Sequence, residues 1–289
     1  ISFYIPEFTP AINLLTQSKF IPRLINQESS ITKYFDKFFD FIILDMQDTS
    51  ELLVSSIKQF ARKVVSFEDL GTGRNHVDLL IDCNLALSKS KNISSKTKAL
   101  FGPDYSVLHP DFSHYHKKPR VFKASINSLL ITMGATDPKN LTLPLTSFVL
   151  QEKNELKLTV LVGHNTKITP KIHQLSNQFQ LLNVLGPVSN MAQMLWEHDV
   201  VICSGGITLH EATSVGTPAF VINQVEQQQT KARFIEKSGA AINLGMGNQH
   251  DVGKLREALN LKKNELELLS LKAKQLIDGR GLFRIIDAI

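Results

Sequence analysis

The 289-residue chain is poor in cysteine and has no apolar run long enough to span a membrane. Cys83 and Cys203 stand far apart, which excludes a disulfide framework and a paired Cys-x-x-Cys metal site and fits a cytoplasmic protein. A transmembrane helix needs about 20 consecutive apolar residues, so no stable membrane insertion is expected. The first residues, ISFYIPEF, lack the basic region and cleavage site of a signal peptide.

The chain also lacks a strong excess of either charge. Its formal net charge is +5, and lysines and arginines are dispersed without interleaved aromatic residues. Nucleic-acid binding proteins gather basic and aromatic residues on one surface, so nucleic acid is not an expected partner. A small anionic ligand fits this composition equally well.

Strand-like and helix-like segments alternate from one end to the other, which predicts an α/β fold with parallel sheets. The string FIILDM, for example, precedes the helical pattern SELLVSSIKQFA. A polar, basic, proline-containing stretch at 109–125 interrupts the alternation and indicates an interdomain connection. We therefore expect two doubly wound domains facing one another, an N-terminal domain at 1–122 and a C-terminal domain at 123–289.

Residues 200–218, VVICSGGITLHEATSVGTP, run from a buried strand pattern through two glycines into a helix pattern. Ser204 is predicted as the N-cap of that helix. A helix N-terminus presents unpaired N–H groups and the positive end of the peptide dipoles, and glycines let an anion approach, so a phosphate is the natural ligand. Gly205 and Gly206 alone are equally well explained by a tight turn.

Other loops follow strands of the second half, where open α/β sheets bind their ligands. They are TMGATDPKN, GPVSNM with Ser189 as a predicted N-cap, and the amide-rich NQVEQQQT. Glycine loops suit a diphosphate, a carboxylate such as Glu211 suits ribose hydroxyls, and amides suit a base or sugar edge. Together these residues indicate a nucleotide-sugar pocket. Glu211 alone is also explained as a first-turn acid favoured by the helix dipole.

A metal clamp on the diphosphate is not expected, because the chain has no Asp-x-Asp pair to chelate a divalent ion. His109, His114 and His116 form the one imidazole cluster, but no carboxylate or fourth ligand is spaced with them. We place them in the linker and expect neither a metal nor a cofactor.

Four segments carry a resemblance to a known family: LLITMGATDPKNLT, NMAQMLWEHDVVICSGGITLHEATSVGTPAFVI, FGPDYSVLHPDF and VVSFEDLG. The chain resembles the UDP-2,4-diacetamido-2,4,6-trideoxy-β-L-altropyranose hydrolases of pseudaminic acid biosynthesis, together with their relatives in spore-coat polysaccharide biosynthesis. These proteins are similar in turn to family 28 glycosyltransferases of GT-B architecture. The resemblance spans nearly the whole chain and implies two Rossmann-like domains with a cleft between them and UDP held mainly by the second.

The resemblance also implies a set of substrate-binding positions. Two departures from the family pattern bear on substrate choice, Ala135 in place of a glycine and His109 in place of an arginine. The positions carried over are Gly134, Thr136, Asp137, Asn190, Met191, Ser204, Gly205, Gly206, Glu211 and Gln228, with Tyr105 and Leu108 close to the cleft.

The catalytic residue is not identified. The family's Gly-x-Gly-His-x-x-Arg loop, whose histidine is the implied base, is expected upstream of Ile1, so an N-terminal strand-helix unit is expected to be missing from this sequence. Asp45, Glu68 and Asp69 follow first-domain strands and are candidates to orient the sugar or the base. Asp45 is alternatively a helix cap, and the Glu68-Asp69 pair a turn.

The implied reaction is attack of water on the anomeric carbon of a UDP-sugar with departure of UDP. Two alternatives remain, a glycosyltransferase that gives the same sugar to an acceptor and a nucleotide-sugar binding module without catalysis. Some relatives imply fusion or association with a cytidylyltransferase.

Overall fold

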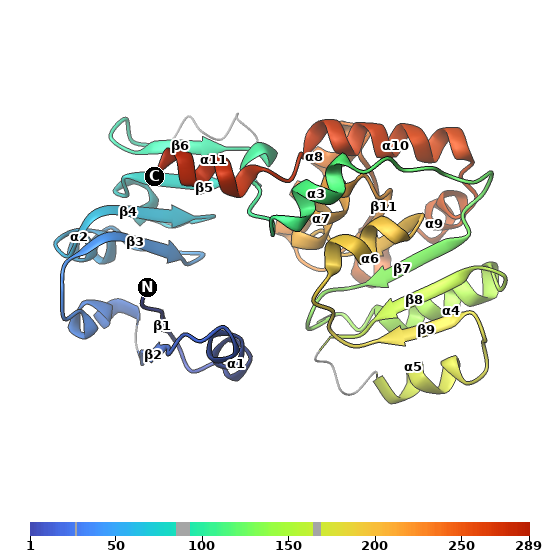
Figure 1. Ribbon diagram of the computed structural model, residues 1–289, viewed down its shortest axis with the longest axis horizontal. Helices are drawn as coiled ribbons and strands as arrows, with labels where there is room; N and C mark the ends of the chain where they lie inside the picture. Colours follow the sequence, from blue (N-terminus) through green and yellow to red (C-terminus); the bar gives the residue numbers. More distant parts are fainter. Residues whose placement is uncertain (27, 85–92, 164–168) are drawn as a thin grey trace. The chain divides into compact units, whose positions relative to one another are not determined.

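The computed structural model describes residues 1–26, 28–84, 93–163 and 169–289 (Figure 1). The chain forms two compact units. Unit 1 comprises Ile1–Asp82 and Ser88–Leu100, and unit 2 comprises Cys83–Leu87 and Phe101–Ile289. Residues 101–122, assigned from the sequence to the first domain, group with unit 2, because the apolar side chains of Leu108 and Phe112 are buried in its core.

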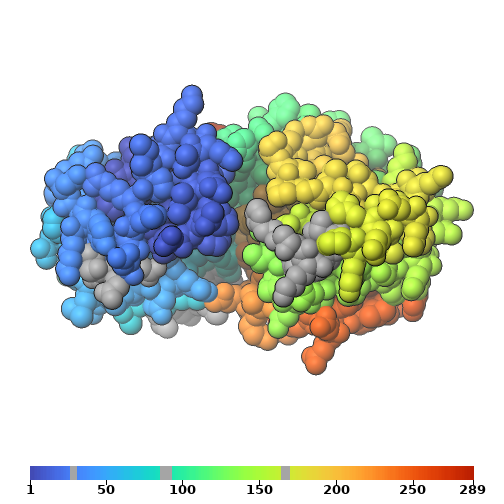
Figure 2. All heavy atoms as spheres, turned by 90° about the horizontal axis from the view of Figure 1, so that it is seen from below, coloured from blue at the N-terminus to red at the C-terminus, as the bar shows by residue number. Residues whose placement is uncertain are grey.

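Unit 1 contains two separate sheets. One has the parallel strands β1 and β2, and the other has the order β3-β4-β5-β6, in which β3, β4 and β5 run parallel. The segment that forms β1, α1 and β2 is dark blue in Figure 2. The elements are β1 (Tyr4–Ile5), α1 (Thr9–Gln17), β2 (Arg23–Leu24), η1 (Glu28–Tyr34), β3 (Phe39–Asp45), α2 (Glu51–Lys58), β4 (Ala61–Phe67), η2 (Thr72–Asn75), β5 (Leu79–Asp82) and β6 (Lys98–Phe101).

Unit 2 is a six-stranded parallel sheet with the order β12-β11-β10-β7-β8-β9. Its strands and main helices are β7 (Ser128–Thr132), α4 (Thr142–Glu152), β8 (Lys157–Leu161), α5 (Thr169–Ser176), β9 (Leu182–Leu185), α6 (Met191–Glu197), β10 (Val200–Cys203), α7 (Ile207–Val215), β11 (Ala219–Asn223), α8 (Glu226–Lys237) and β12 (Ala241–Met246). The remaining elements are η4 (Pro103–Tyr105), α3 (Asp111–Lys117), η5 (Gly247–Gln249), α9 (Val252–Ala258), α10 (Lys263–Leu276) and α11 (Gly281–Ala288).

The central strands β7, β8, β10 and β11 are buried on both faces, as expected for a parallel sheet covered by helices on each side. Successive side chains of a strand point to opposite faces. Leu129 and Ile131 of β7 accordingly lie in one apolar cluster, while Leu130 lies in the other. In the same way, Ile202 of β10 packs in the first cluster and Val201 in the second. This continuous apolar character makes the strand strings easy to recognise in the sequence.

The strand order of unit 2 reverses direction between β7 and β10, which pair side by side although β8 and β9 intervene in the chain. In such doubly wound sheets the two loops that leave the neighbouring strands diverge to opposite faces, and a crevice forms at their carboxyl ends. The topology therefore directs the search for a ligand site to the loops after β7 and β10.

Arg120 attaches the segment before β7 to the end of α6. Its guanidinium donates to the carbonyls of Trp196 at 2.8 Å and His198 at 2.5 Å, and to Thr217 Oγ1 at 3.1 Å. Burial lowers the pKa of Arg120 to about 10. A cation at the C-terminal end of a helix satisfies carbonyls that have no partner within the helix.

Arg120→Met is therefore expected to lower the free energy of unfolding by about 2 kcal/mol, because the carbonyls at the end of α6 lose a buried charged donor. Urea unfolding measures the change. Arg23→Met is the control, since Arg23 pairs with Asp36 on the exposed surface and its loss is expected to change little. Equal effects of the two variants would contradict the anchoring role of Arg120.

Candidate functional site

The loops after β7 and β10 meet around the hydroxyl of Ser204. Gly134 has φ +88°, a left-handed conformation that favours glycine. Ser204 Oγ lies 3.8 Å from the point where a Cβ of Gly134 would stand and 3.6 Å from the same point on Gly206. Ser204 is only 5% exposed. A hydroxyl donor is thus held between the two glycine loops at the position where the strand order reverses.

Ser204 is not the N-cap of α7, which corrects the expectation from the sequence. The helix begins at Ile207, and Gly206 is its N-cap without a side-chain hydrogen bond. The glycine pair delays the first helical turn by two residues, so the hydroxyl of Ser204 cannot reach the N–H groups that a cap would bind. The N-terminus of α7 therefore presents backbone N–H groups that no capping side chain occupies.

Gly205 and Gly206 have different physical roles. A Cβ on Gly205 would lie 2.3 Å from Asn223 Oδ1 and 2.9 Å from the backbone oxygen of Gln228, so a side chain is sterically excluded there. The nearest neighbours of a Cβ on Gly206 would be Ser204 Oγ and, at 3.7 Å, Gln228 Nε2. The turn explanation thus applies to Gly205, while Gly206 is bordered by polar atoms that can donate hydrogen bonds.

Glu211 lies one turn into α7 and is mostly buried. Burial raises its pKa to about 7, although a hydrogen bond from the Thr208 side chain acts in the opposite direction. Cys203, directly before the loop, is fully buried, and burial together with the charge of Glu211 raises the pKa of its thiol to about 12. Near neutral pH, Glu211 is thus divided between its two protonation states, while Cys203 stays a thiol.

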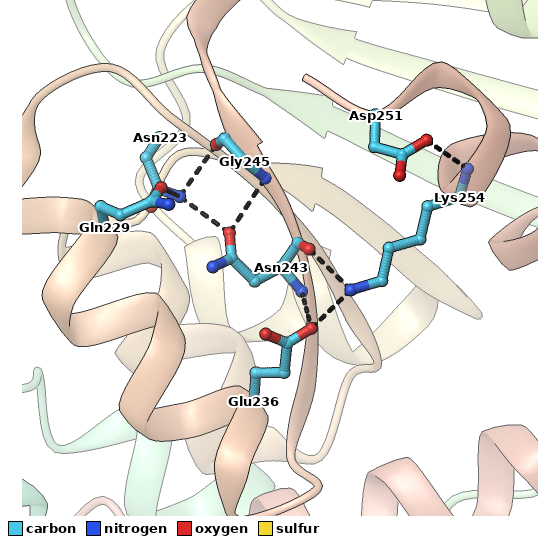
Figure 3. Close-up of polar contacts among 7 residues, drawn as sticks. All are labelled: Asn223, Gln229, Glu236, Asn243, Gly245, Asp251 and Lys254. Atoms are coloured by element: carbon cyan, nitrogen blue, oxygen red, sulfur yellow. Dashed lines mark hydrogen bonds and ion pairs between the residues drawn. The ribbon is translucent and has the colours of Figure 1, made fainter. Parts of the chain in front are cut away.

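Polar groups of β11, α8, β12 and α9 form the network in Figure 3. Asn223 Nδ2 contacts Gln229 Oε1 at 2.8 Å, Asn243 Oδ1 at 2.9 Å and the carbonyl of Gly245 at 3.0 Å. Lys254 Nζ donates to Glu236 Oε1 and to the carbonyl of Asn243. The sequence indicated that amides after β11 would face a ligand, but those of Asn223 and Gln229 bind one another inside the protein.

His210, next to Glu211 on α7, had no signal in the sequence. It is 1% exposed, and its Nδ1 lies 3.1 Å from Ser106 Oγ and 3.7 Å from Cys83 Sγ. Burial, with a smaller contribution from the charge of Lys231, lowers its pKa well below the ordinary value, so the ring is neutral. His210 connects the segment before α3 to the helix that carries Glu211.

Asp137 organises the loop after β7. It is buried, with φ +39°, and its carboxylate accepts from the N–H groups of Leu141 and Thr142 and from Thr142 Oγ1 at 2.6 Å. The carboxylate thereby satisfies the first turn of α4, where N–H groups lack partners within the helix. Thr136, the neighbouring candidate, is exposed at the rim.

The remaining unit 2 candidates are placed as follows. Asn190, not Ser189, is the N-cap of α6, and its Oδ1 accepts from the N–H of Gln193 at 3.1 Å. Met191 packs against the apolar core, and the side chain of Leu108 is buried within it. Tyr105 lies half-buried in η4. The side chains of Met191 and Leu108 are thus engaged in packing, unlike that of Ser204.

The acidic candidates of unit 1 are not equivalent. Asp69 is fully buried and accepts from Thr49 N and Oγ1, from Ser66 Oγ at 3.1 Å and from Gly71 N at 2.9 Å. Its carboxylate holds together the loops after β3 and β4, as the turn explanation predicts. Asp45 and Glu68 are exposed at the ends of β3 and β4.

The described residues contain no cluster of three or more His, Cys, Asp or Glu side chains that could hold a metal ion. Among the helices of the described ranges, none is both long enough and apolar enough to cross a bilayer.

The two parallel α/β units, the second with a glycine-lined helix N-terminus where its strand order reverses, define a GT-B-like α/β protein. Residues 128–278 match the glycosyltransferase family 28 C-terminal domain, and the chain belongs to this family. The solved structure of MurG from Acinetobacter baumannii has the same fold, with a TM-score of 0.67 at 15% identity over 100% of this chain and 90% of that one.

Two relatives match along most of their own length. The spore coat polysaccharide biosynthesis protein SpsG of Bacillus subtilis is 25% identical over 91% of this chain and 80% of its own. The UDP-2,4-diacetamido-2,4,6-trideoxy-beta-L-altropyranose hydrolase of Campylobacter jejuni is 26% identical over 70% of this chain and 72% of its own. The resemblance and the GT-B-like fold expected from the sequence are thereby confirmed.

Proposed function

We propose that unit 2 binds a UDP-sugar at the carboxyl ends of β7 and β10, and that the protein releases UDP by attack of water on the anomeric carbon. The uncapped N-terminus of α7, with Ser204 Oγ between Gly134 and Gly206, is the observation that carries this proposal. Helix N-termini with glycine loops are established sites for phosphate groups. The sugar class is inferred from the hydrolase relative.

The site residues divide between binding and chemistry. The N–H groups at Gly206 and Ile207 and the hydroxyl of Ser204 would donate to the diphosphate, and the carboxylate of Glu211 would accept from the ribose hydroxyls. The oxygen of water forms a bond to the anomeric carbon while the bond from that carbon to the diphosphate oxygen breaks, and UDP leaves with the electron pair. Preorganised donors facing the growing charge contribute about 3 kcal/mol each in a dry site.

The residue that takes the proton from water is proposed to precede Ile1, as the resemblance implies. The strand arrangement of unit 1 supports this placement. In unit 2, β7 lies between β8 and β10 and belongs with them to one sheet. In the described residues of unit 1, the pair β1-β2 and the strands β3-β4-β5-β6 form separate sheets. Among the described residues of unit 1, no strand pairs with both sheets.

Unit 1 also has exposed apolar side chains on β3 and α1. Phe41 and Ile43 of β3, two residues apart on one face, are 44% and 57% exposed, and Leu14 of α1 is 65% exposed. An edge strand with exposed apolar residues is normally covered in a native protein. A preceding strand and helix would cover both surfaces and bring a catalytic loop to the carboxyl end of the sheet.

A glycosyltransferase is the second candidate, because the family match is to a glycosyltransferase domain. The two reactions share UDP as leaving group and differ in the nucleophile, which is water in one and an acceptor hydroxyl in the other. Fusion or association with a cytidylyltransferase, and a cytoplasmic location, remain part of the proposal that rests on the resemblance.

The decisive experiment incubates the full-length protein with UDP-linked diacetamido-trideoxy sugars and measures free UDP with and without acceptors, in water labelled with heavy oxygen. Release of UDP without an acceptor, with label in the sugar, is expected for hydrolysis. Release only with an acceptor supports transfer, and binding without release supports a binding module. Absence of UDP binding in calorimetry contradicts the site itself.

A further inference from the structure

Gln224, the residue after β11, connects the two loops that border the proposed diphosphate site. It is 4% exposed. Its Nε2 donates to the carbonyl of Met133 at 2.6 Å, and its Oε1 accepts from the N–H of Lys139 at 3.3 Å. The carbonyl partner requires the NH₂ group and the N–H partner requires the oxygen, so the orientation of the amide is determined by both ends of the loop after β7.

The backbone of Gln224 is engaged on the opposite side. Its N–H donates to Gln228 Oε1 at 2.8 Å. With the oxygen of Gln228 held in this way, the Nε2 of the same amide lies 3.7 Å from the point where a Cβ of Gly206 would stand. Gln224 thus binds the Gly134 loop with its side chain and the side chain of Gln228 with its backbone N–H.

The hydrogen bonds of Gln224 fix the distance between the loop after β7 and the side chain of Gln228, which follows β11. Met133 directly precedes Gly134, whose backbone borders Ser204 Oγ, and Gln228 borders Gly206 from the other side. These links are hydrogen bonds, and Gly134 has no side chain that could add packing to them. Donors that must converge on one anion lose their effect when they are displaced by about 1 Å.

We propose that Gln224 is a positioning residue that holds the Gly134 loop and the amide of Gln228 in register for the two phosphates of the ligand. The inference rests on the proposed UDP site and deepens it. Gln224 itself touches no ligand, because each polar atom of its amide is occupied within the protein. Its action is therefore confined to the diphosphate half of the ligand, and recognition of the nucleoside does not depend on it.

The test compares Gln224→Glu and Gln224→Met with Asn260→Asp as matched control. Glutamate keeps the acceptor for Lys139 but places an oxygen against the carbonyl of Met133, and methionine removes both contacts at similar volume. Asn260 also makes two side-chain hydrogen bonds, to Lys153 and to the carbonyl of Arg256, but it follows α9 and takes no part in the Gly134 and Gln228 loops. Thermal unfolding verifies that each variant is folded.

Affinities for UDP and for uridine are then measured on each protein. Both Gln224 variants are expected to bind UDP about tenfold more weakly or worse, the effect of losing one hydrogen bond to a charged group, while uridine affinity stays unchanged. A general structural defect would weaken both ligands together. Unchanged UDP affinity, or an equal loss for UDP and uridine, would overturn the positioning role.

Amide hydrogen exchange gives a readout without a ligand. Exchange at 133–139 and at 224–228 is expected to accelerate together in Gln224→Met and to stay unchanged in Asn260→Asp. Faster exchange in only one of the two segments, or in neither, would overturn the proposal. If the wild-type protein fails to bind UDP while the two segments still respond together, the positioning role stands and the proposed function is the part that fails.

Discussion

The Glu211→Gln variant is expected to be more stable than the wild type at about pH 8 and, at the same time, to bind UDP more weakly. The carboxyl of Glu211 has its pKa raised from 4.5 to about 7, chiefly by burial. In the range between these values the folded protein holds a proton that the unfolded chain releases. Stability is therefore highest below the unfolded pKa and falls as the pH rises through the folded pKa.

The size of the change in stability follows from the pKa shift of Glu211. One pKa unit corresponds to about 1.4 kcal/mol, so the ionised carboxylate lowers the free energy of unfolding by up to about 3 kcal/mol above pH 7. Glutamine carries no charge and avoids this loss. The difference in Tm between variant and wild type is expected to be small at about pH 5 and to reach several degrees at about pH 8. A difference that does not change with pH would show that Glu211 is ionised throughout.

The binding effect has the opposite sign. A carboxylate accepts stronger hydrogen bonds from ribose hydroxyls than an amide, and loss of a charged acceptor weakens binding about tenfold or more. Because the ligand favours the ionised form, UDP affinity of the wild type is expected to rise between about pH 6 and pH 8 beyond the rise seen in Glu211→Gln. Calorimetry on both proteins separates this contribution from titration of the diphosphate. Parallel pH profiles would remove Glu211 from the ribose site.

Gly205→Ala is expected to have the second large effect, a loss of more than about 3 kcal/mol of stability together with UDP binding. The new methyl would stand 2.3 Å from Asn223 Oδ1 and 2.9 Å from the carbonyl oxygen of Gln228. Asn223 is fully buried and its Nδ2, which has two hydrogens, has three acceptors within hydrogen-bond distance, so rotation of this amide would break these contacts. The loop itself would have to move, and with it the N-terminus of α7.

Gly186→Ala provides the control, since a Cβ at this position would meet no atom within 4 Å. Gly186 also follows a strand of unit 2, β9, so the two variants differ in packing and not in general location. The control is expected to unfold like the wild type. If Gly205→Ala behaves like the control, the close contact between the β10 loop and the end of β11 is not rigid.

The α/β alternation was predictable from the sequence because parallel strands buried on both faces read as continuous apolar strings. Val200 to Ile202 and Leu129 to Ile131 illustrate this, since all six are completely buried. The position of the loops after these strands was equally predictable, because carboxyl ends of parallel strands share one edge of the sheet. The domain boundary was not predictable, because the apolar residues of 101–122 do not by themselves specify whether they join the core of unit 1 or that of unit 2.

Side-chain roles were harder to predict than positions. Asp69 was a candidate because it follows a strand, and Asp137 because the family resemblance implied it, but each accepts several hydrogen bonds from its own loops. Conversely, His210 and Gln224 were not marked, because nothing local distinguishes a buried polar side chain from an exposed one. Ser204 was assigned as a cap from its place in the sequence, and the two glycines that follow prevent this.

The sequence by itself determined the class of fold and the family, because hydrophobic periodicity and the motifs that carry the resemblance are local properties of the chain. Only the tertiary structure decided which polar groups in the loops after the strands remain available to a ligand. Hydrogen bonds to segments far apart in the chain occupy Asn223 and Gln224, whereas the start of α7 has no capping side chain and borders the proposed site. Such pairing depends on distances that exist only after the sheet has formed.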